Sequence, residues 1–316
     1  MSGPAPLLKV RDLRVHFATE GSLVRAVDGV DLELRAGETL ALVGESGCGK
    51  STLARALVGL NPVTSGTAEL NGRTITGLTR AAARSFRREL QLVFQDPYAS
   101  LNPRFTIAQT LAEPLLLHEK ASRSNVDSKV CELLAQVGLD PELRARYPHE
   151  FSGGQRQRIS IARALAVEPS LLLCDEVTSA LDVSIQAQIL DLLRSVQQRL
   201  GLSYLFITHD LGVVRYIAHR VAVMYVGQIV ELRDTESLFE SPAHPYTQAL
   251  LASIPRVSRA PGAIRVPLGG EVPSAARPPS GCRFHPRCSR AFDRCPKEQP
   301  ELYPVSGGSS RCFLNH

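Results

Sequence analysis

The chain has 316 residues, of which 44% are hydrophobic and 21% charged, and its formal net charge is +5. This composition is typical of a globular protein and excludes a wholly disordered or fibrous chain. No run approaches the roughly 18 consecutive apolar residues of a membrane-spanning helix, so we expect no span. Met1 to Lys9 lack the charged start and apolar run of an export signal, so we expect cytoplasmic chemistry.

The predicted elements alternate between strands and helices. Short strands are expected at 31–35 and 39–43, then a glycine-rich loop, a helix at 50–60, a hairpin at Asn71-Gly72 and a strand at 90–94. A Leu-rich helical pattern follows over 107–138, interrupted at Pro114, then a helix at 154–167, a strand at 171–174, a helix at 185–200 and strands at 204–208, 220–225 and 229–232. This order predicts an α/β fold with a mostly parallel sheet covered on both faces.

The last quarter of the chain differs in composition. Residues 241–316 contain 10 basic and 4 acidic residues and 12 of the 21 prolines. Four of the seven cysteines lie there, at Cys282, Cys288, Cys295 and Cys312. A basic tail can contact nucleic acid, acidic lipid or a partner protein.

A phosphate-binding loop follows the strand at 39–43. Its eight residues are Gly44, Glu45, Ser46, Gly47, Cys48, Gly49, Lys50 and Ser51. Glycines let the backbone wrap around phosphate oxygens, the lysine neutralises the outer phosphates, and the serine hydroxyl can hold Mg²⁺. We predict an ATP and Mg²⁺ site here and include Thr52, the next residue.

Two further segments carry chemistry. Asp175 and Glu176 follow the apolar strand at 171–174. We expect Asp175 to hold Mg²⁺ through its outer shell and Glu176 to act as the general base for the attacking water. Ser152, Gly153, Gly154 and Gln155 begin a helix, which predicts a second anion site. One nucleotide does not need two such sites on one chain, so we expect a head-to-tail dimer.

These motifs resemble those of ABC ATPases. Residues 152–155 resemble the signature motif, with Phe151 where leucine is commoner. Gln95 resembles the Q-loop glutamine that contacts Mg²⁺, His209 the switch histidine that senses the γ-phosphate, and Phe17 the aromatic residue that stacks on adenine. Residues 179–182 resemble the D-loop, and Asp182 is included among the predicted nucleotide-binding residues.

The resemblance also implies a domain organisation. It predicts a P-loop ATPase core formed by residues 1–88 and 166–240, and a helical signature subdomain at 89–165. A small cysteine-containing C-terminal appendage is expected at 241–316.

A closer resemblance is to the dipeptide, oligopeptide and nickel importers. It rests on residues 94–103, 147–150 and 244–250, and Cys48 with Gln155-Arg156 resembles the second of the two paralogous ATPase subunits of these importers. The resemblance implies a heterodimer with the paralogue, two membrane-spanning permease subunits, an extracytoplasmic peptide-binding protein, and a place on the cytoplasmic face of the inner membrane. The cargo stays open, and no nucleic acid is expected.

One position departs from the family pattern. Val177 stands where a proline usually follows the catalytic glutamate. A proline there would restrict φ and remove a backbone N–H donor. Glu176 itself is intact, so we expect hydrolysis to survive.

The tail cysteines leave three alternatives. Clustered thiols in a cytosolic protein favour a metal site over disulfides, and this segment has little apolar material for a core. Their spacing lacks the close pairs of zinc sites and fits a four-cysteine iron–sulfur cluster better. Members of the resembling subfamily are thought to hold a [4Fe-4S] cluster, so we rank iron–sulfur first, zinc second and free thiols third.

Two rival functions remain. The basic tail fits a soluble ABC ATPase that acts on the ribosome or nucleic acid, although such proteins commonly fuse two cassettes. The tail cysteines also fit a redox sensor that regulates the ATPase.

Overall fold

The computed structural model describes residues 5–19, 21–253 and 269–316. Residues 1–4, 20 and 254–268, which fall inside the predicted domain ranges, lie outside the described part. The chain forms two compact units, one of Met1–Leu34, Thr39–Gly77 and Ile207–His316 and the other of Arg35–Glu38 and Leu78–Phe206. The division into core, helical subdomain and C-terminal region stays a prediction.

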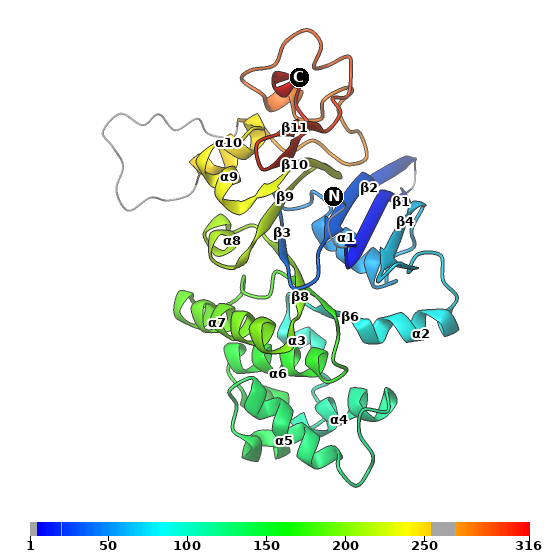
Figure 1. The fold of residues 1–316 in the computed structure, drawn as a ribbon, viewed down its shortest axis with the longest axis vertical. Helices are drawn as coiled ribbons and strands as arrows, with labels where there is room; N and C mark the ends of the chain where they lie inside the picture. Colours follow the sequence, from blue (N-terminus) through cyan, green and yellow to red (C-terminus); the bar gives the residue numbers. More distant parts are fainter. Residues whose placement is uncertain (1–4, 20, 254–268) are drawn as a thin grey trace. The chain divides into compact units, whose positions relative to one another are not determined.

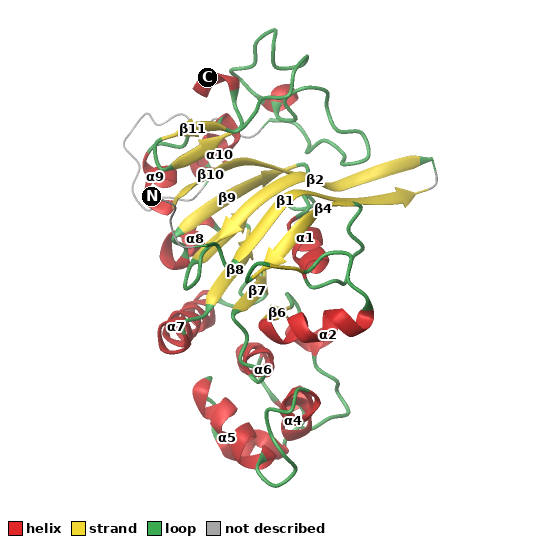
Figure 2. Ribbon diagram, turned by 45° about the vertical axis from the view of Figure 1, so that its right-hand side comes forward, coloured by secondary structure: helices red, strands yellow, loops and turns green. Residues whose placement is uncertain are grey.

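The first unit contains an antiparallel sheet of order β2-β1-β4-β5 (Figure 2). Its strands are β1 (Leu8–Thr19), β2 (Ser22–Leu34), β4 (Ser65–Leu70) and β5 (Arg73–Thr74). The predicted hairpin is confirmed, because Asn71 and Gly72 both have positive φ, as a type I′ turn requires.

The sequence analysis missed β1 entirely. Bulges between Val10 and Leu13 and between Val15 and His16 shift the register against β2. The buried residues Leu8, Val10, Leu13 and Val15 therefore break strict alternation. A bulge of this kind conceals the two-residue period by which a strand is recognised.

A second sheet in the first unit joins the C-terminal region to the core (Figure 1). Its order is β11-β12-β10-β9-β3, with β3 (Thr39–Val43) and β9 (Arg220–Tyr225) parallel. The strands β10 (Gln228–Asp234), β12 (Gly308–Ser310) and β11 (Tyr303–Val305) continue it antiparallel. The helices of this unit are α1 (Lys50–Leu57), α8 (Leu211–Ile217), α9 (Thr235–Glu240) and α10 (Pro245–Ala252), with 3₁₀ turns at His285–Arg287 and Phe313–Asn315.

An aromatic cluster holds the C-terminal region in place. Tyr225 of β9, Tyr246 of α10 and Phe284 have ring centroids 4.6, 5.3 and 5.4 Å apart. All three side chains are buried. Aromatic pairs at these separations are stabilising beyond the area they bury.

The second unit combines three strands with six helices among its described residues. The strand β7 (Leu171–Asp175) lies between β6 (Leu90–Val93) and β8 (Ser203–Thr208), and β6 and β7 run parallel. Its helices are α2 (Arg80–Glu89), α3 (Pro97–Ser100), α4 (Ile107–Leu117), α5 (Val126–Gln136), α6 (Gly153–Leu165) and α7 (Val183–Leu200), with 3₁₀ turns at Pro141–Ala145 and Pro148–Glu150.

The predicted helix break at Pro114 is wrong. The helix α4 runs through Pro114 to Leu117, and the interruption lies before α5, which begins at Val126. An internal proline costs about 3 kcal/mol. Burial of Ile107, Leu111 and Leu115 along one helix face, together with the capping box of Thr106 and Gln109, offsets that cost.

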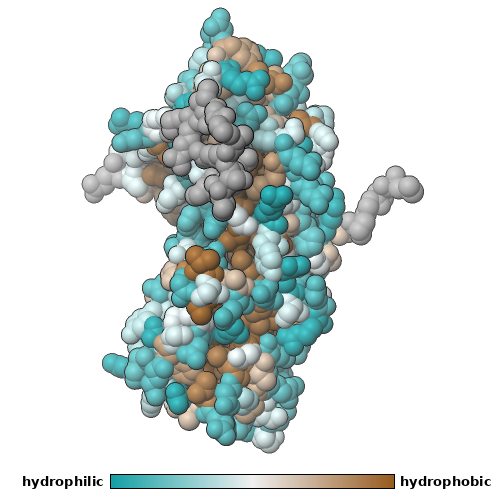
Figure 3. Space-filling model, turned by 90° about the vertical axis from the view of Figure 1, so that its left-hand side faces the viewer, coloured by the Kyte–Doolittle hydropathy of each residue, from teal (hydrophilic) through white to brown (hydrophobic). Residues whose placement is uncertain are grey.

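In the part of the chain that the structure describes, no helix combines the length and hydropathy needed to cross a membrane. The face drawn in Figure 3 is mostly hydrophilic, with small scattered hydrophobic areas. Scattered apolar surface of this kind is ordinary for a folded protein.

A buried ion pair ties the C-terminal region to β2. Arg283 donates to the carboxylate of Asp28 and to the Val226 carbonyl, and only 6% of its side chain is exposed. The ion pair and hydrogen bonds from Arg283 lower the pKa of Asp28, although its burial acts in the opposite direction. We expect the pair to contribute to stability.

Replacing Arg283 with methionine should lower the free energy of unfolding by about 3 kcal/mol, because the Asp28 carboxylate, 13% exposed, loses its strongest partner. The loss is at the low end of the usual range since His16 still contacts Asp28 at 3.1 Å. Chemical denaturation of the full chain measures it. The matched control is Arg11→Met, whose pair with Glu33 is exposed and should be worth about 1 kcal/mol or less. Equal losses in both variants would contradict this assignment.

Candidate functional site

The glycine-rich loop has the predicted position between a strand and a helix. The wholly buried strand β3 ends at Val43, and α1 begins at Lys50. A Cβ at Gly44 would overlap the Met224 carbonyl, and one at Gly49 would overlap the Ala26 carbonyl. The neighbouring backbone therefore requires glycine at both positions, independently of any ligand.

Lys50 is folded against the loop that it follows. Only 5% of the residue is exposed, and its Nζ donates to the carbonyls of Gly44 at 2.8 Å and Glu45 at 3.0 Å. Ser51 and Thr52 are partly buried on the first turn of α1. The loop thus concentrates one cation, two hydroxyl groups and a helix N-terminus, which suits an anionic ligand.

Cys48 is a small, buried residue of this loop. It is 1% exposed, and burial raises the pKa of its thiol. Its sulfur lies 3.8 Å from Lys50 Nζ. A buried protonated thiol is a poor nucleophile, so the structure favours a packing role for this residue.

Glu45 makes contacts that the sequence analysis missed. Its backbone N–H donates to the Tyr246 hydroxyl at 3.0 Å, and its carboxylate accepts two bonds from Arg287 at 2.7 and 3.1 Å. Tyr246 lies in the segment 244–250, which carried the importer resemblance, but nothing in the sequence indicated its contact. Arg287 lies 242 residues from Glu45 and matches no motif.

His244 positions Tyr246 at the start of α10. Its Nδ1 accepts the Tyr246 N–H at 3.0 Å. Complete burial lowers the pKa of His244 to about 3, so the ring is neutral and able to accept. Its backbone N–H and that of Ala243 donate to the buried carboxylate of Glu231.

Phe17 and His209 also belong to the first unit. Phe17 lies on β1 opposite Val24 and is partly exposed, which leaves ring surface for a ligand. His209 is exposed and follows β8, directly before Asp210, which caps α8. Their predicted roles toward adenine and the γ-phosphate stay predictions.

In the second unit, Gln95 and Glu176 come together. The Nε2 of Gln95 donates to Glu176 Oε2 at 2.9 Å. The two residues follow the adjacent parallel strands β6 and β7, in which Val93 is paired with Cys174. Carboxyl ends of parallel strands meet at one sheet edge, so the contact follows from the strand order.

Asp175 and Glu176 differ in burial and in backbone conformation. Asp175 is 2% exposed at the end of β7, whereas Glu176 is partly exposed with a φ of 50°. A positive φ is uncommon for a residue other than glycine and concentrates at functional sites. Val177, which departs from the family pattern, is 2% exposed and packs in the interior.

The predicted signature segment begins α6. The hydroxyl of Ser152 accepts the Gln155 N–H at 3.3 Å, and Gln155 Oε1 accepts the Ser152 N–H at 3.0 Å, forming a capping box. A Cβ at Gly154 would overlap Ile185 of α7. Helix packing therefore requires glycine at 154, in addition to any role at a phosphate.

Asp182 has a clear local role. Its Oδ1 accepts the Ile185 N–H at 2.9 Å and the Ser184 hydroxyl at 2.7 Å, which caps α7. The bond from Ser184 lowers the pKa of Asp182. Its predicted part in nucleotide binding stays a prediction.

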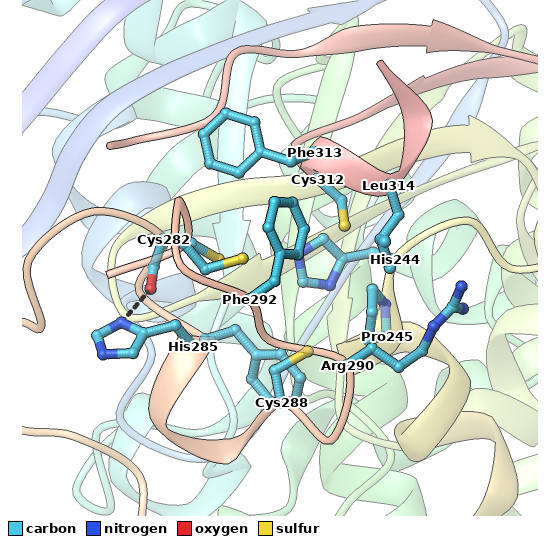
Figure 4. A pocket seen from close by; sticks show the side chains of 12 residues that line it. His244, Pro245, Cys282, His285, Cys288, Arg290, Phe292, Cys312, Phe313 and Leu314 are labelled. Carbon is cyan, nitrogen blue, oxygen red and sulfur yellow. Dashed lines mark hydrogen bonds between the residues drawn. The ribbon is translucent and has the colours of Figure 1, made fainter. Parts of the chain in front are cut away.

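The four tail cysteines line one small cavity of about 10 Å³ (Figure 4). That is room for about one water molecule. None of the seven cysteines, all of which lie in the described part of the chain, forms a disulfide bond, and burial raises the pKa of Cys282 to about 11. Among the described residues, no three His, Cys, Asp or Glu side chains are arranged to hold a metal ion.

Two known protein families match this chain, one over the phosphate-binding loop and one over the C-terminal region that contacts it. Residues 27–179 match the family model described as ABC transporter. Residues 230–295 match the model described as oligopeptide/dipeptide transporter, C-terminal region. The second match contains Tyr246 and Arg287, the two residues that contact Glu45.

Named relatives match nearly the whole chain. The di/tripeptide transport ATP-binding protein DppF of Pseudomonas aeruginosa is 50% identical, with 94% of each chain covered. The oligopeptide transport ATP-binding protein AppF of Bacillus subtilis is 49% identical, covering 94% of this chain and 93% of its own. The dipeptide transport ATP-binding protein DppF of Escherichia coli is 46% identical, covering 98% and 94%.

A solved structure agrees with the fold. A dimeric post-hydrolysis state of the ATP-binding cassette MJ0796, bound to ADP and Pi, matches with a TM-score of 0.66 and 27% identity. The match covers 72% of this chain and 98% of that cassette. Together with the phosphate-binding loop and the Gln95–Glu176 contact, these similarities establish that the chain belongs to the ABC transporter family, among the ATP-binding proteins of its peptide-transport branch.

Proposed function

We propose that this chain is the ATP-hydrolysing subunit that powers import of di- or oligopeptides through an ABC transporter. The observation that supports ATP hydrolysis is the hydrogen bond between Gln95 and Glu176 beside the buried Asp175. Peptide cargo is supported by the names of relatives that match nearly the full chain, which are described as peptide-transport ATP-binding proteins.

The phosphate-binding loop receives the triphosphate. Lys50 exchanges its bonds to the Gly44 and Glu45 carbonyls for bonds to phosphate oxygens. Ser51 holds Mg²⁺, and Thr52 and the loop N–H groups complete the phosphate contacts. Phe17 stacks on the adenine.

The second group of residues performs the chemistry. Gln95 and Asp175 hold Mg²⁺ and its shell, and Glu176 orients and deprotonates the attacking water. His209 senses the γ-phosphate. The bond from Gln95 fixes the position of one oxygen of Glu176.

A second chain completes the site. The segment 152–155 acts on the nucleotide of the partner, and Asp182 contributes to nucleotide binding. We propose the paralogous ATPase as partner, two permease subunits above the pair, and an extracytoplasmic peptide-binding protein as the source of cargo. The chain is then peripheral at the cytoplasmic face of the inner membrane, held by the permeases.

We also propose that Cys282, Cys288, Cys295 and Cys312 hold a metal centre, a [4Fe-4S] cluster in preference to zinc. The support is the donor set, because all four cysteines line one cavity; three of them, Cys282, Cys288 and Cys312, are labelled in Figure 4. The cavity is too small for a cluster as it stands, so loading requires the four side chains to move apart.

The variant Glu176→Gln should reduce ATP hydrolysis by about 100-fold or more, because the water loses its general base. Binding of ATP should persist, and the dimer should accumulate in a closed state. In proteoliposomes carrying the whole transporter, uptake of labelled peptide should stop. The control Glu132→Gln, at an exposed site on α5, should hydrolyse normally. Undiminished turnover in Glu176→Gln would overturn the assignment.

Hydrolysis should depend on protein concentration, because each site needs the signature segment of a second chain. The rate per chain should fall on dilution below the dissociation constant, and adding the paralogous subunit should restore it. Analytical ultracentrifugation with ATP measures the assembly. A constant rate per chain from a monomer at every dilution would contradict the shared site.

Anaerobically purified protein should contain iron and acid-labile sulfide in stoichiometric amounts and absorb visible light. The variant Cys295→Ser should lose both, while Cys131→Ser on α5 should retain them. One zinc per chain in colourless protein would assign the site to zinc instead. Absence of both metals would leave four free thiols and remove the proposal.

A further inference from the structure

The phosphate-binding loop is held at Glu45 by the C-terminal region. The Glu45 N–H donates to Tyr246 Oη at 3.0 Å, and the carboxylate accepts from Arg287 Nη1 and Nη2 at 2.7 and 3.1 Å. The Glu45 carbonyl accepts from Lys50 at 3.0 Å. Both backbone groups and the side chain of this residue therefore have defined partners.

Arg287 is itself immobilised. Its side chain is 4% exposed, its Nε donates to the Gly269 carbonyl at 3.0 Å, and its guanidinium lies 5.8 Å from the Tyr225 ring centroid. The Nη1 also lies 3.3 Å from the Tyr225 hydroxyl. The hydrogen bonds that Arg287 donates to Glu45 raise the pKa of Arg287, so it stays charged. Five contacts leave this guanidinium little freedom to turn elsewhere.

The pairing with Glu45 is geometrically specific. A planar guanidinium matches the two oxygens of a carboxylate, and two parallel bonds fix direction as well as distance. The Glu45 side chain is 25% exposed, so the pair is only partly screened by water. A lysine at this position would supply the positive charge but not the two parallel N–H donors of a guanidinium.

A loop that binds phosphate through backbone N–H groups has to be ordered before or during binding. Ordering it in advance spares the ligand part of that entropic cost. Glu45 is the second residue of the loop, so a clamp on its side chain and N–H restrains the backbone beside Gly44 and Ser46. The clamp comes from residues distant in sequence that the ATPase motifs do not include.

We propose that Arg287 is a positioning residue for nucleotide binding, which acts through Glu45 to keep the phosphate-binding loop in the conformation that receives ATP. The proposal rests on the proposed function only in requiring that this loop binds ATP. Arg287 itself does not touch the nucleotide. The C-terminal region thereby contributes to the ATP affinity of the core.

A double-mutant cycle on the full-length chain tests the pair. ATP affinity is measured by isothermal titration for the wild type, Arg287→Met, Glu45→Gln and the double variant. Methionine keeps most of the buried stem of Arg287 and removes its charge. Each single variant should weaken ATP binding about tenfold. The double variant should bind ATP no more weakly than the single variant with the lower affinity.

Two more variants separate positioning from general stability. Arg287→Lys should recover part of the affinity, and Arg294→Met, which removes an exposed pair with Glu298 in the same region, should bind ATP normally. In the assembled transporter, Arg287→Met should raise KM for ATP about tenfold with kcat changed less than twofold. If Arg287 had a purely structural role, the variant would show a lower melting temperature without a selective rise in KM.

Normal ATP affinity in a folded Arg287→Met variant would overturn the proposal, as would additive losses in the double variant. Tighter binding would mean that Arg287 restrains the loop in an unreceptive state, which also overturns it. If Arg287→Met does not fold, Glu45→Gln tests the proposal instead. Normal ATP affinity in Glu45→Gln would overturn it, because Arg287 is proposed to act through Glu45. Lys50→Ala distinguishes the two proposals. Unchanged ATP binding in that variant contradicts the loop's assigned function, whereas lost binding there with normal affinity in Arg287→Met contradicts the clamp alone.

Discussion

The close approach of backbone segments around the phosphate-binding loop is the constraint on which the nucleotide site depends. The carbonyls of Met224 and Ala26 occupy the space that side chains at Gly44 and Gly49 would need. The loop is therefore seated against β9 and β2 before any ligand arrives. The same seating brings Lys50 onto the loop carbonyls, where an anion competes for its charge.

The C-terminal region is part of this arrangement and not a separate attachment. It extends the sheet through β12, buries Phe284 against Tyr225 and Tyr246, and pairs Arg283 with Asp28. These contacts set the positions of Tyr246 and Arg287 at Glu45. The transporter-specific part of the chain and its general ATP-binding part thus meet at one residue of the loop.

Local sequence pattern was sufficient to predict the motifs whose residues lie close together in the sequence. The loop, the buried strand before Asp175 and the capped helix at Ser152 were predicted because each forms from residues within one turn of one another. The contact of Gln95 with Glu176 followed once β6 and β7 were placed side by side. Local pattern failed at β1, where bulges break the alternation, and at Pro114, where burial of neighbouring leucines outweighs the lost hydrogen bond.

The amino-acid order alone determined the family resemblance, the ATP-binding motifs and the choice of the residues that we propose for hydrolysis. Tertiary structure decided that Glu45 is clamped, that Cys48 is buried, that Gly154 is required by Ile185, and that four distant cysteines line one cavity. The reason is that motifs record short-range backbone geometry. Contacts such as that of Glu45 with Arg287 arise only when sheet pairing and aromatic packing bring remote segments together.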